Sequence, residues 1–161
     1  MKITNKKTVS INDIKKNLEQ RDSEELITYC LRLAKYKKEN KELIGFLLFE
    51  SDDIPGFIEN VKEETEHLFR EINKSNIYFI KKSVRKILKN VNKYIRFAAL
   101  KQFEAELLIH FCNCILSFSI PIKESRQLTN LYETQLQKIE DILSELHPDL
   151  QYDLKRQHRK L

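Results

Sequence analysis

The 161 residues of this chain are enough for one domain that buries about two thirds of its unfolded surface. Hydrophobic residues make up 41% of the chain and charged residues 33%, which is typical of a globular protein rather than a disordered one. The chain has only two glycines and three prolines, so glycine-rich phosphate loops are excluded and many tight turns are not expected. These features predict an all-α fold.

The cysteines and the apolar runs predict a cytoplasmic protein without a membrane partner. Three cysteines are an odd number, and Cys112 and Cys114 are too close in a helical run to form a disulfide easily. The N-terminus is basic but has no apolar stretch after it, so we expect no secretory signal. The most apolar run, residues 107–122, is too short to span a bilayer and contains several polar residues.

Helix-capping residues precede apolar residues spaced three or four apart in the first 50 residues. Ser10 and Asp13 have the spacing of a capping box for a short helix that ends near residue 20. Asp22 or Ser23 caps a second helix, and we expect Asn40 to cap a third that ends near Phe49. Because the turn between them is short, residues 23–50 should form an antiparallel helical hairpin.

The remainder of the chain predicts four or five further helices. Residues 51–56 have the composition of a turn, and Pro55 suits the start of an acidic helix that extends to about Ser75. A basic helix follows from Asn76, with a break expected between residues 98 and 102. An apolar helix at 107–118, a helix at 123–146 and a short helix from Pro148 complete the prediction.

The predicted fold is a single compact domain, residues 1–161, of seven or eight mostly antiparallel helices. The hairpin at 23–50 resembles the helical pairs of HEAT-type proteins in its general pattern only, so the arrangement is either an irregular bundle or a short HEAT-like helical array. We expect residues 1–9 and the basic residues 155–161 to be mobile tails. The 107–118 helix should lie at the centre, surrounded by apolar residues of the other helices: Leu26, Leu31, Leu43, Phe46, Leu47, Phe69, Val84, Val91, Leu131 and Ile139.

The strongest charge feature is a basic helix within residues 74–101. No Asp or Glu occurs between Ile72 and Phe103, whereas nine Lys and Arg do, and the rest of the chain carries a net charge of −4. At about 100° per residue, most of these cations fall within roughly 140° of the helix circumference, opposite the apolar residues. The candidate surface for an anionic partner consists of Lys81, Lys82, Arg85, Lys86, Lys89, Lys93 and Arg96.

Three interpretations of this basic helix remain open. Its cations could be solvated or paired with the acidic helix at 57–75, they could bind another protein, or they could bind nucleic acid. For the third case, Tyr78 and Phe97 are candidate stacking surfaces near the cations. We expect another protein as the partner, with nucleic acid as the alternative, and the sequence leaves the oligomeric state open.

Two patterns could hold a metal ion, but neither predicts a site. On a helix, His110 and Cys114 share one face whereas Cys112 points about 160° away, so three ligands would not converge. Glu64 and His67 have the Glu-x-x-His spacing of di-iron bundles, but the chain has no second copy. We therefore expect no metal and no cofactor.

No nucleophile elbow or cysteine-protease signature is present in the chain. The leading functional hypothesis is a non-catalytic interaction or scaffold module. The first alternative is a nucleic-acid-binding protein that uses the basic helix, and the second is an enzyme with an unrecognised helical site.

Overall fold

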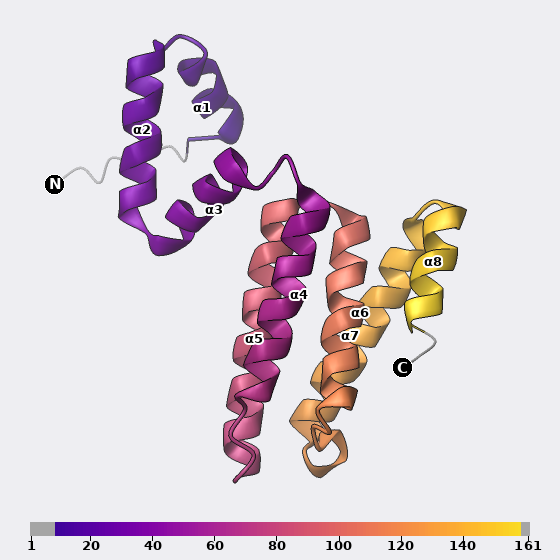
Figure 1. Ribbon diagram of the computed structural model, residues 1–161. Coiled ribbons are helices and arrows are strands. Elements are labelled where there is room, and N and C mark those ends of the chain that lie inside the picture. Colours follow the sequence, from indigo (N-terminus) through magenta and orange to yellow (C-terminus); the bar gives the residue numbers. More distant parts are fainter. Residues whose placement is uncertain (1–8, 159–161) are drawn as a thin grey trace, which may run out of the picture. The chain divides into compact units, whose positions relative to one another are not determined.

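A computed structural model describes residues 9–158 of the chain (Figure 1). Within these residues the chain forms eight α-helices and one short 3₁₀ helix, and no β-strand, so the predicted all-α class is confirmed. The contacts divide the chain into two units, residues 1–48 and residues 49–161, which we describe in turn. The organisation of the chain as one domain stays a prediction.

The first unit contains α1 (Ile11–Leu18), α2 (Ser23–Tyr36) and most of α3 (Lys38–Phe49). The Ser10 hydroxyl accepts from the Asp13 backbone N–H at 3.1 Å while the Ser10 N–H donates to the Asp13 carboxylate, so the predicted capping box is confirmed. Asn40 does not cap α3, because that helix begins at Lys38. Its side-chain amide donates instead to the Leu33 carbonyl at 2.8 Å.

Few apolar side chains of the first unit are buried. Among its described residues, Phe46 is the one large hydrophobic residue that is buried, with 2% of its surface exposed. Leu31, Leu43 and Leu47 are exposed, so the prediction that they belong to the core is wrong. The spacing of apolar residues identifies one side of a helix, but it does not show whether another element covers that side.

The second unit begins with α4 (Ile54–Arg70), whose first turn depends on a close approach between a carboxylate and the backbone. The Asp53 side chain accepts from the Gly56 N–H at 3.0 Å. A Cβ atom at position 56 would lie 2.2 Å from the other Asp53 carboxylate oxygen, so a larger residue there would require the Asp53 side chain to shift. Pro55 lies in the same turn, as predicted.

The predicted end of α4 near Ser75 is wrong, because the helix ends at Arg70. Two asparagine side chains in the following segment accept from backbone N–H groups: Asn73 from Ser75 and Asn76 from Tyr78. Such local bonds compete with helix continuation. The second of them caps α5 (Ile77–Ala98), which therefore begins where the sequence predicted.

The long basic helix ends at the predicted break. Ala99 adopts a left-handed conformation with φ 52°, and its N–H donates to the Ile95 carbonyl, which ends α5. After one further residue, α6 (Lys101–Ser117) begins. At the other end of α6, the Lys74 ammonium donates to the Phe118 carbonyl at 2.6 Å, where the helix dipole favours a cation.

The core of the second unit is built around α6, as predicted. This helix packs against α4, α5, α7 (Arg126–Glu145) and α8 (Pro148–His158), and a 3₁₀ helix (Ile122–Glu124) precedes α7. The rings of Phe69 and Phe111 lie 5.6 Å apart in this core. Eight α6 side chains are buried: Ala105, Leu107, Leu108, Ile109, Phe111, Cys112, Cys114 and Ile115.

The C-terminal helix is longer than the sequence indicated. Residues 155–158 continue α8, whereas the sequence predicts a tail from residue 155. The other residues of the predicted tails, 1–8 and 159–161, lie outside the described residues. In the part of the chain that the structure describes, no helix combines the length and the apolar character needed to cross a lipid bilayer.

Candidate functional site

The helix α5 separates its apolar residues from its cations. Its buried side chains include Ile80, Val84, Ile87, Val91 and Ile95, which are spaced three or four apart and face the core. The opposite side carries the basic surface, which we define as the seven predicted residues Lys81, Lys82, Arg85, Lys86, Lys89, Lys93 and Arg96. Lys81 and Lys93 are half-buried, and the other five are exposed.

Four lysines of the basic surface have no anionic partner among residues 9–158. Lys81, Lys82, Lys86 and Lys89 form no ion pair with any described residue. Arg85 also lacks a carboxylate partner there, and its Nη2 donates to the Gln127 side-chain oxygen of α7 at 2.7 Å. In the described part of the second unit, no carboxylate therefore pairs with these five cations.

The acidic residues of α4 interact elsewhere. Glu59 pairs with Lys62, and Glu66 pairs with Arg70, both within α4. Glu64 reaches α5, but it accepts from neutral groups: the Asn90 amide at 2.8 Å and the Tyr94 hydroxyl at 2.9 Å. The carboxylates of α4 therefore do not neutralise Lys81, Lys82, Lys86 or Lys89 in the part of the chain that the structure describes.

A hollow of about 510 Å³ lies at the N-terminal end of the basic surface, between α5 and α7. Its walls are formed by Tyr78, Lys81, Lys82, Arg85 and Gln127. Three cations, one aromatic ring and one amide thus surround a single space. None of the wall residues is acidic.

The aromatic side chains near the cations differ in part from those predicted. Tyr78 is 60% exposed, as a stacking surface requires, and Phe79 beside it is also exposed, with the two ring centroids 5.6 Å apart. Phe97 is only 8% exposed and packs edge-on against Tyr94, so its prediction as a stacking surface is wrong. Its position on α5 turns it toward the core.

The sequence patterns did not indicate one wall residue of the hollow, Gln127, and one exposed aromatic residue near the cations, Phe79. Gln127 is 42 residues from Arg85 in the chain, and no local pattern indicates that α7 brings it to α5. Phe79 directly follows Tyr78, and this aromatic pair at the start of a basic helix is a signal that could have been used.

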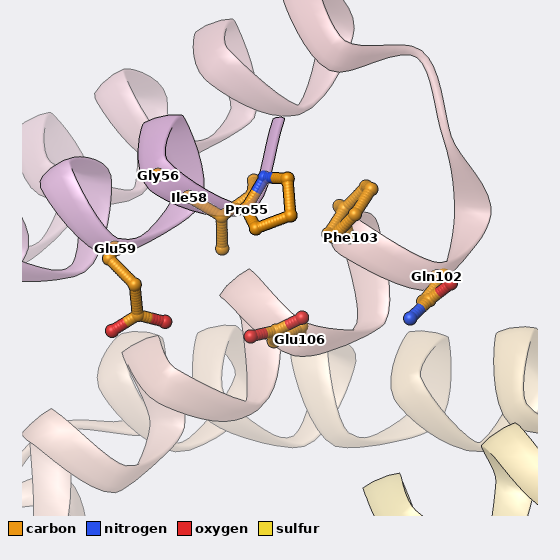
Figure 2. A pocket seen from close by; sticks show the side chains of 7 residues that line it. All are labelled: Pro55, Gly56, Ile58, Glu59, Gln102, Phe103 and Glu106. Atoms are coloured by element: carbon orange, nitrogen blue, oxygen red, sulfur yellow. The ribbon is translucent and has the colours of Figure 1, made fainter. Parts of the chain in front are cut away.

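A second hollow, of about 420 Å³, lies between α4 and α6 (Figure 2). In Figure 2, the rings of Pro55 and Phe103 form one part of its wall and the carboxylates of Glu59 and Glu106 form another. Lys62 donates to both carboxylates at 2.6 Å, so the charges at this hollow neutralise one another to a large extent. The arrangement joins α4 to α6 and leaves no strong electrostatic preference for a ligand.

The two cysteines of the His110–Cys114 run point in different directions, as predicted. The Cys114 sulfur lies 3.5 Å from the His110 Nε2 atom, which also contacts the Lys62 carbonyl oxygen at 3.3 Å. Cys112 instead neighbours Tyr132 of α7, whose pKa is raised by burial and by the Cys112 thiol. Burial raises the pKa of each thiol to about 12, which makes both poor nucleophiles and poor metal ligands.

Glu64 and His67 also do not form a joint site. Glu64 is bound by α5, whereas the His67 ring lies 3.6 Å from the Glu71 carboxylate on an exposed part of α4. Within the described residues, no group of three or more His, Cys, Asp or Glu side chains is arranged to hold a metal ion.

The fold and the candidate site together define an all-α protein with a row of cations along one side of α5. Comparisons of the chain with protein families, with curated proteins and with solved structures found no match.

Proposed function

We propose that the protein is a non-catalytic interaction module that binds an anionic macromolecule through the basic surface of α5. The observation that carries this proposal is the absence of an anionic partner for Lys81, Lys82, Lys86 and Lys89 among the described residues. Unpaired like charges on adjacent turns repel one another, and a partner with a row of anions relieves that repulsion.

Nucleic acid is the partner that fits this surface best. From Lys81 to Arg96 the helix rises about 22 Å, at roughly 1.5 Å per residue, which is long enough to follow several phosphates of one strand. Interfaces with proteins usually need a desolvated apolar or aromatic centre, whereas interfaces with nucleic acid are polar and strongly basic. Among the described residues of α5, the exposed aromatic side chains are Tyr78 and Phe79, both at its N-terminal end. An acidic protein is the second candidate.

The contacts of the potential catalytic groups support a non-catalytic role. Lys62 is held between two carboxylates, and burial lowers the pKa of His110, whose ring contacts the α4 backbone. Two of the three thiols are buried with a raised pKa. Lys62 and His110 instead form contacts between α4 and α6. The three free thiols are also consistent with a cytoplasmic location, which we include in the proposal.

The test is a charge reversal of three exposed lysines, Lys82→Glu, Lys86→Glu and Lys89→Glu, in one variant. Binding of fluorescently labelled DNA and RNA is followed by anisotropy at several salt concentrations. We expect the wild-type affinity to fall steeply with salt, with a log–log slope near −0.9 per phosphate contacted on a duplex. The variant should bind with an affinity at least roughly tenfold lower than that of the wild type, and its affinity should depend less steeply on salt.

The matched control carries the same change of net charge on the first unit. Lys16, Lys35 and Lys41 are exposed and form no ion pair among the described residues, so replacing all three with Glu alters net charge without altering the basic surface. Both variants should keep the wild-type thermal stability within a few degrees, because exposed charges contribute little. Equal losses of binding in both variants, or no salt-dependent binding by the wild-type protein, would contradict the proposal. Salt-sensitive binding of an acidic protein in place of nucleic acid would support the second candidate.

A further inference from the structure

The hollow between α5 and α7 differs from the rest of the basic surface. Here three of its cations, with Tyr78 and Gln127, line a space of about 510 Å³. Ligand sites for small molecules are typically about 300–1,000 Å³. The hollow is thus larger than a phosphate group alone requires.

Arg85 is held in place at the wall of this hollow. Its Nη2 donates to the Gln127 oxygen at 2.7 Å, a contact that joins α5 to α7. A guanidinium has five N–H donors in a planar fork, so the remaining donors can still bind two oxygens of one phosphate. The Gln127 oxygen accepts this bond, and the Gln127 side chain contributes an amide group to the wall of the hollow.

Lys81 and Lys82 add two ammonium groups to the same wall. Neither forms an ion pair with a described residue, and the whole segment between Ile72 and Phe103 contains no carboxylate. The hollow also lies within the first turns of α5, where the partial positive charge of the helix N-terminus adds to the ammonium charges. The combined field favours a ligand group with more than one negative charge or several anionic oxygens.

The Tyr78 ring supplies a different kind of contact. It is exposed, it lines the hollow, and its edge-to-face contact with Phe79 at 5.6 Å restricts its orientation. A planar aromatic ring beside a phosphate-binding cluster is the arrangement in which a nucleobase can stack while its own phosphate is held.

We propose that this hollow binds one nucleotide of a single-stranded nucleic acid, with a phosphate on Lys81, Lys82 and Arg85 and the base on Tyr78. The proposal rests on the function proposed above and specifies the form of nucleic acid. Bases of a duplex are stacked on their neighbours and cannot reach a ring on the protein surface, whereas bases of a single strand can. The protein therefore prefers single strands to duplexes of the same length.

The first experiment removes the ring. Tyr78→Ala should weaken binding of a single-stranded oligonucleotide of about 10–20 nucleotides by about 5- to 150-fold, the range found for the loss of one stacked base. Tyr78→Phe keeps the ring and should bind nearly as the wild type does. Tyr152→Ala, which removes an exposed tyrosine of α8, is the control and should change nothing. Affinity for a duplex should stay within about twofold in all three variants.

The second experiment tests the phosphate contact and the source of the nucleotide. Arg85→Lys retains the charge but loses the planar fork, so single-strand affinity should fall more than duplex affinity does. A nucleoside monophosphate should compete only weakly, because it lacks the neighbouring phosphates that contact the rest of α5. A mononucleotide that binds as tightly as the oligonucleotide would assign the hollow to free nucleotides and overturn the single-strand assignment.

The two proposals fail in distinguishable ways. If the triple lysine variant loses binding while Tyr78→Ala and Arg85→Lys bind single strands as the wild type does, the hollow has no special role and the basic surface alone carries the interaction. A preference of the wild-type protein for duplexes would likewise overturn the inference about the hollow. If no nucleic acid binds at all, the proposed function fails with it.

Discussion

The ion pairs of Lys62 join α4 to α6, and their removal gives the most direct test of how the second unit is held together. The Lys62 ammonium lies 2.6 Å from a carboxylate oxygen of Glu59 on its own helix and 2.6 Å from one of Glu106 on α6. The side chains of Lys62 and Glu106 are each 18% exposed. Replacing Lys62 with Met keeps most of the aliphatic volume but leaves the Glu106 carboxylate without its cation.

The expected cost lies between two known limits. Breaking a fully buried ion pair costs about 3–5 kcal/mol, and an exposed pair contributes about 0–1 kcal/mol. Because this pair is mostly but not fully buried, we expect Lys62→Met to lower the free energy of unfolding by about 1–3 kcal/mol. Glu106→Gln should cost a similar amount. The double variant should lose less than the sum of the two, with a coupling of about 1 kcal/mol or more.

The assay is urea unfolding followed by circular dichroism, with the four proteins of the double-mutant cycle compared under one condition. Arg70→Met is the matched control, since Arg70 pairs with Glu66 on the same helix at 2.9 Å but both side chains are largely exposed. It should cost less than about 0.5–1 kcal/mol. If Lys62→Met costs no more than Arg70→Met, or if the two single changes are additive, this pair does not hold α4 on α6.

The same pair predicts a dependence on pH at the alkaline end. Burial lowers the pKa of Lys62, but hydrogen bonds and charge attraction from Glu106 and Glu59 together outweigh it, so its pKa lies above the usual 10.5. A raised pKa in the folded state means that the charged lysine contributes its full stabilisation below pH 10.5 and loses it as the pH rises through the folded-state pKa. The difference in stability between wild type and Lys62→Met should therefore be constant near neutral pH and should shrink above about pH 10.5.

Two further predictions concern the core and its thiols. Leu108→Ala should lower the free energy of unfolding by about 2–5 kcal/mol in the same assay, because Leu108 is fully buried in α6. Leu116, also on α6, is 41% exposed, so Leu116→Ala should cost under about 1 kcal/mol. Equal costs for the two changes would place α6 at the surface. The exposed thiol of Cys30 should react with a thiol reagent in the native protein. The buried thiols of Cys112 and Cys114, with pKa values of about 12, should react only on unfolding. Rapid labelling of all three thiols in the native protein would contradict the burial of Cys112 and Cys114.

Several features of the fold were predictable because their causes are local in the sequence. The capping box at Ser10 needs only two residues three apart, and the start of α5 at Asn76 needs only a side-chain oxygen before a periodic apolar run. The break at Ala99 followed from the length of the helical run, since a helix of over 40 residues is rare in a compact unit. The central place of α6 followed from its apolar residues, which occur on all sides of the helix.

Other features depend on contacts between distant parts of the chain and were not predictable in the same way. Leu31 and Leu47 have the spacing of core residues, yet they are exposed, because periodicity does not identify a covering element. By contrast, the end of α4 at Arg70 has a local cause. The Asn73 side chain accepts from the Ser75 backbone N–H, and such a bond competes with helix continuation but is not revealed by the spacing of apolar residues.

The candidate site also contains features that could be predicted from the sequence and features that could not. The seven cations of the basic surface could be found from charge and periodicity alone. The hollow could not, because its fifth wall residue, Gln127, comes from α7, and because the absence of ion pairs depends on where the α4 carboxylates point. Charge patterns show which residues share a side of a helix, whereas pairing depends on the neighbouring helices.

The order of the helices in the chain affects how the protein is made. The common packing partner of α4, α5, α7 and α8 is α6, which begins only at residue 101. Ribosomes add about 5–20 residues per second, so the 17 residues of α6 take on the order of one to a few seconds to synthesise. A helical hairpin of α4 and α5 forms much faster than that. Until α6 is available, the nascent chain therefore exposes the apolar sides of α4 and α5, which the finished protein buries against α6. Chaperones and neighbouring chains can bind these apolar sides during this interval.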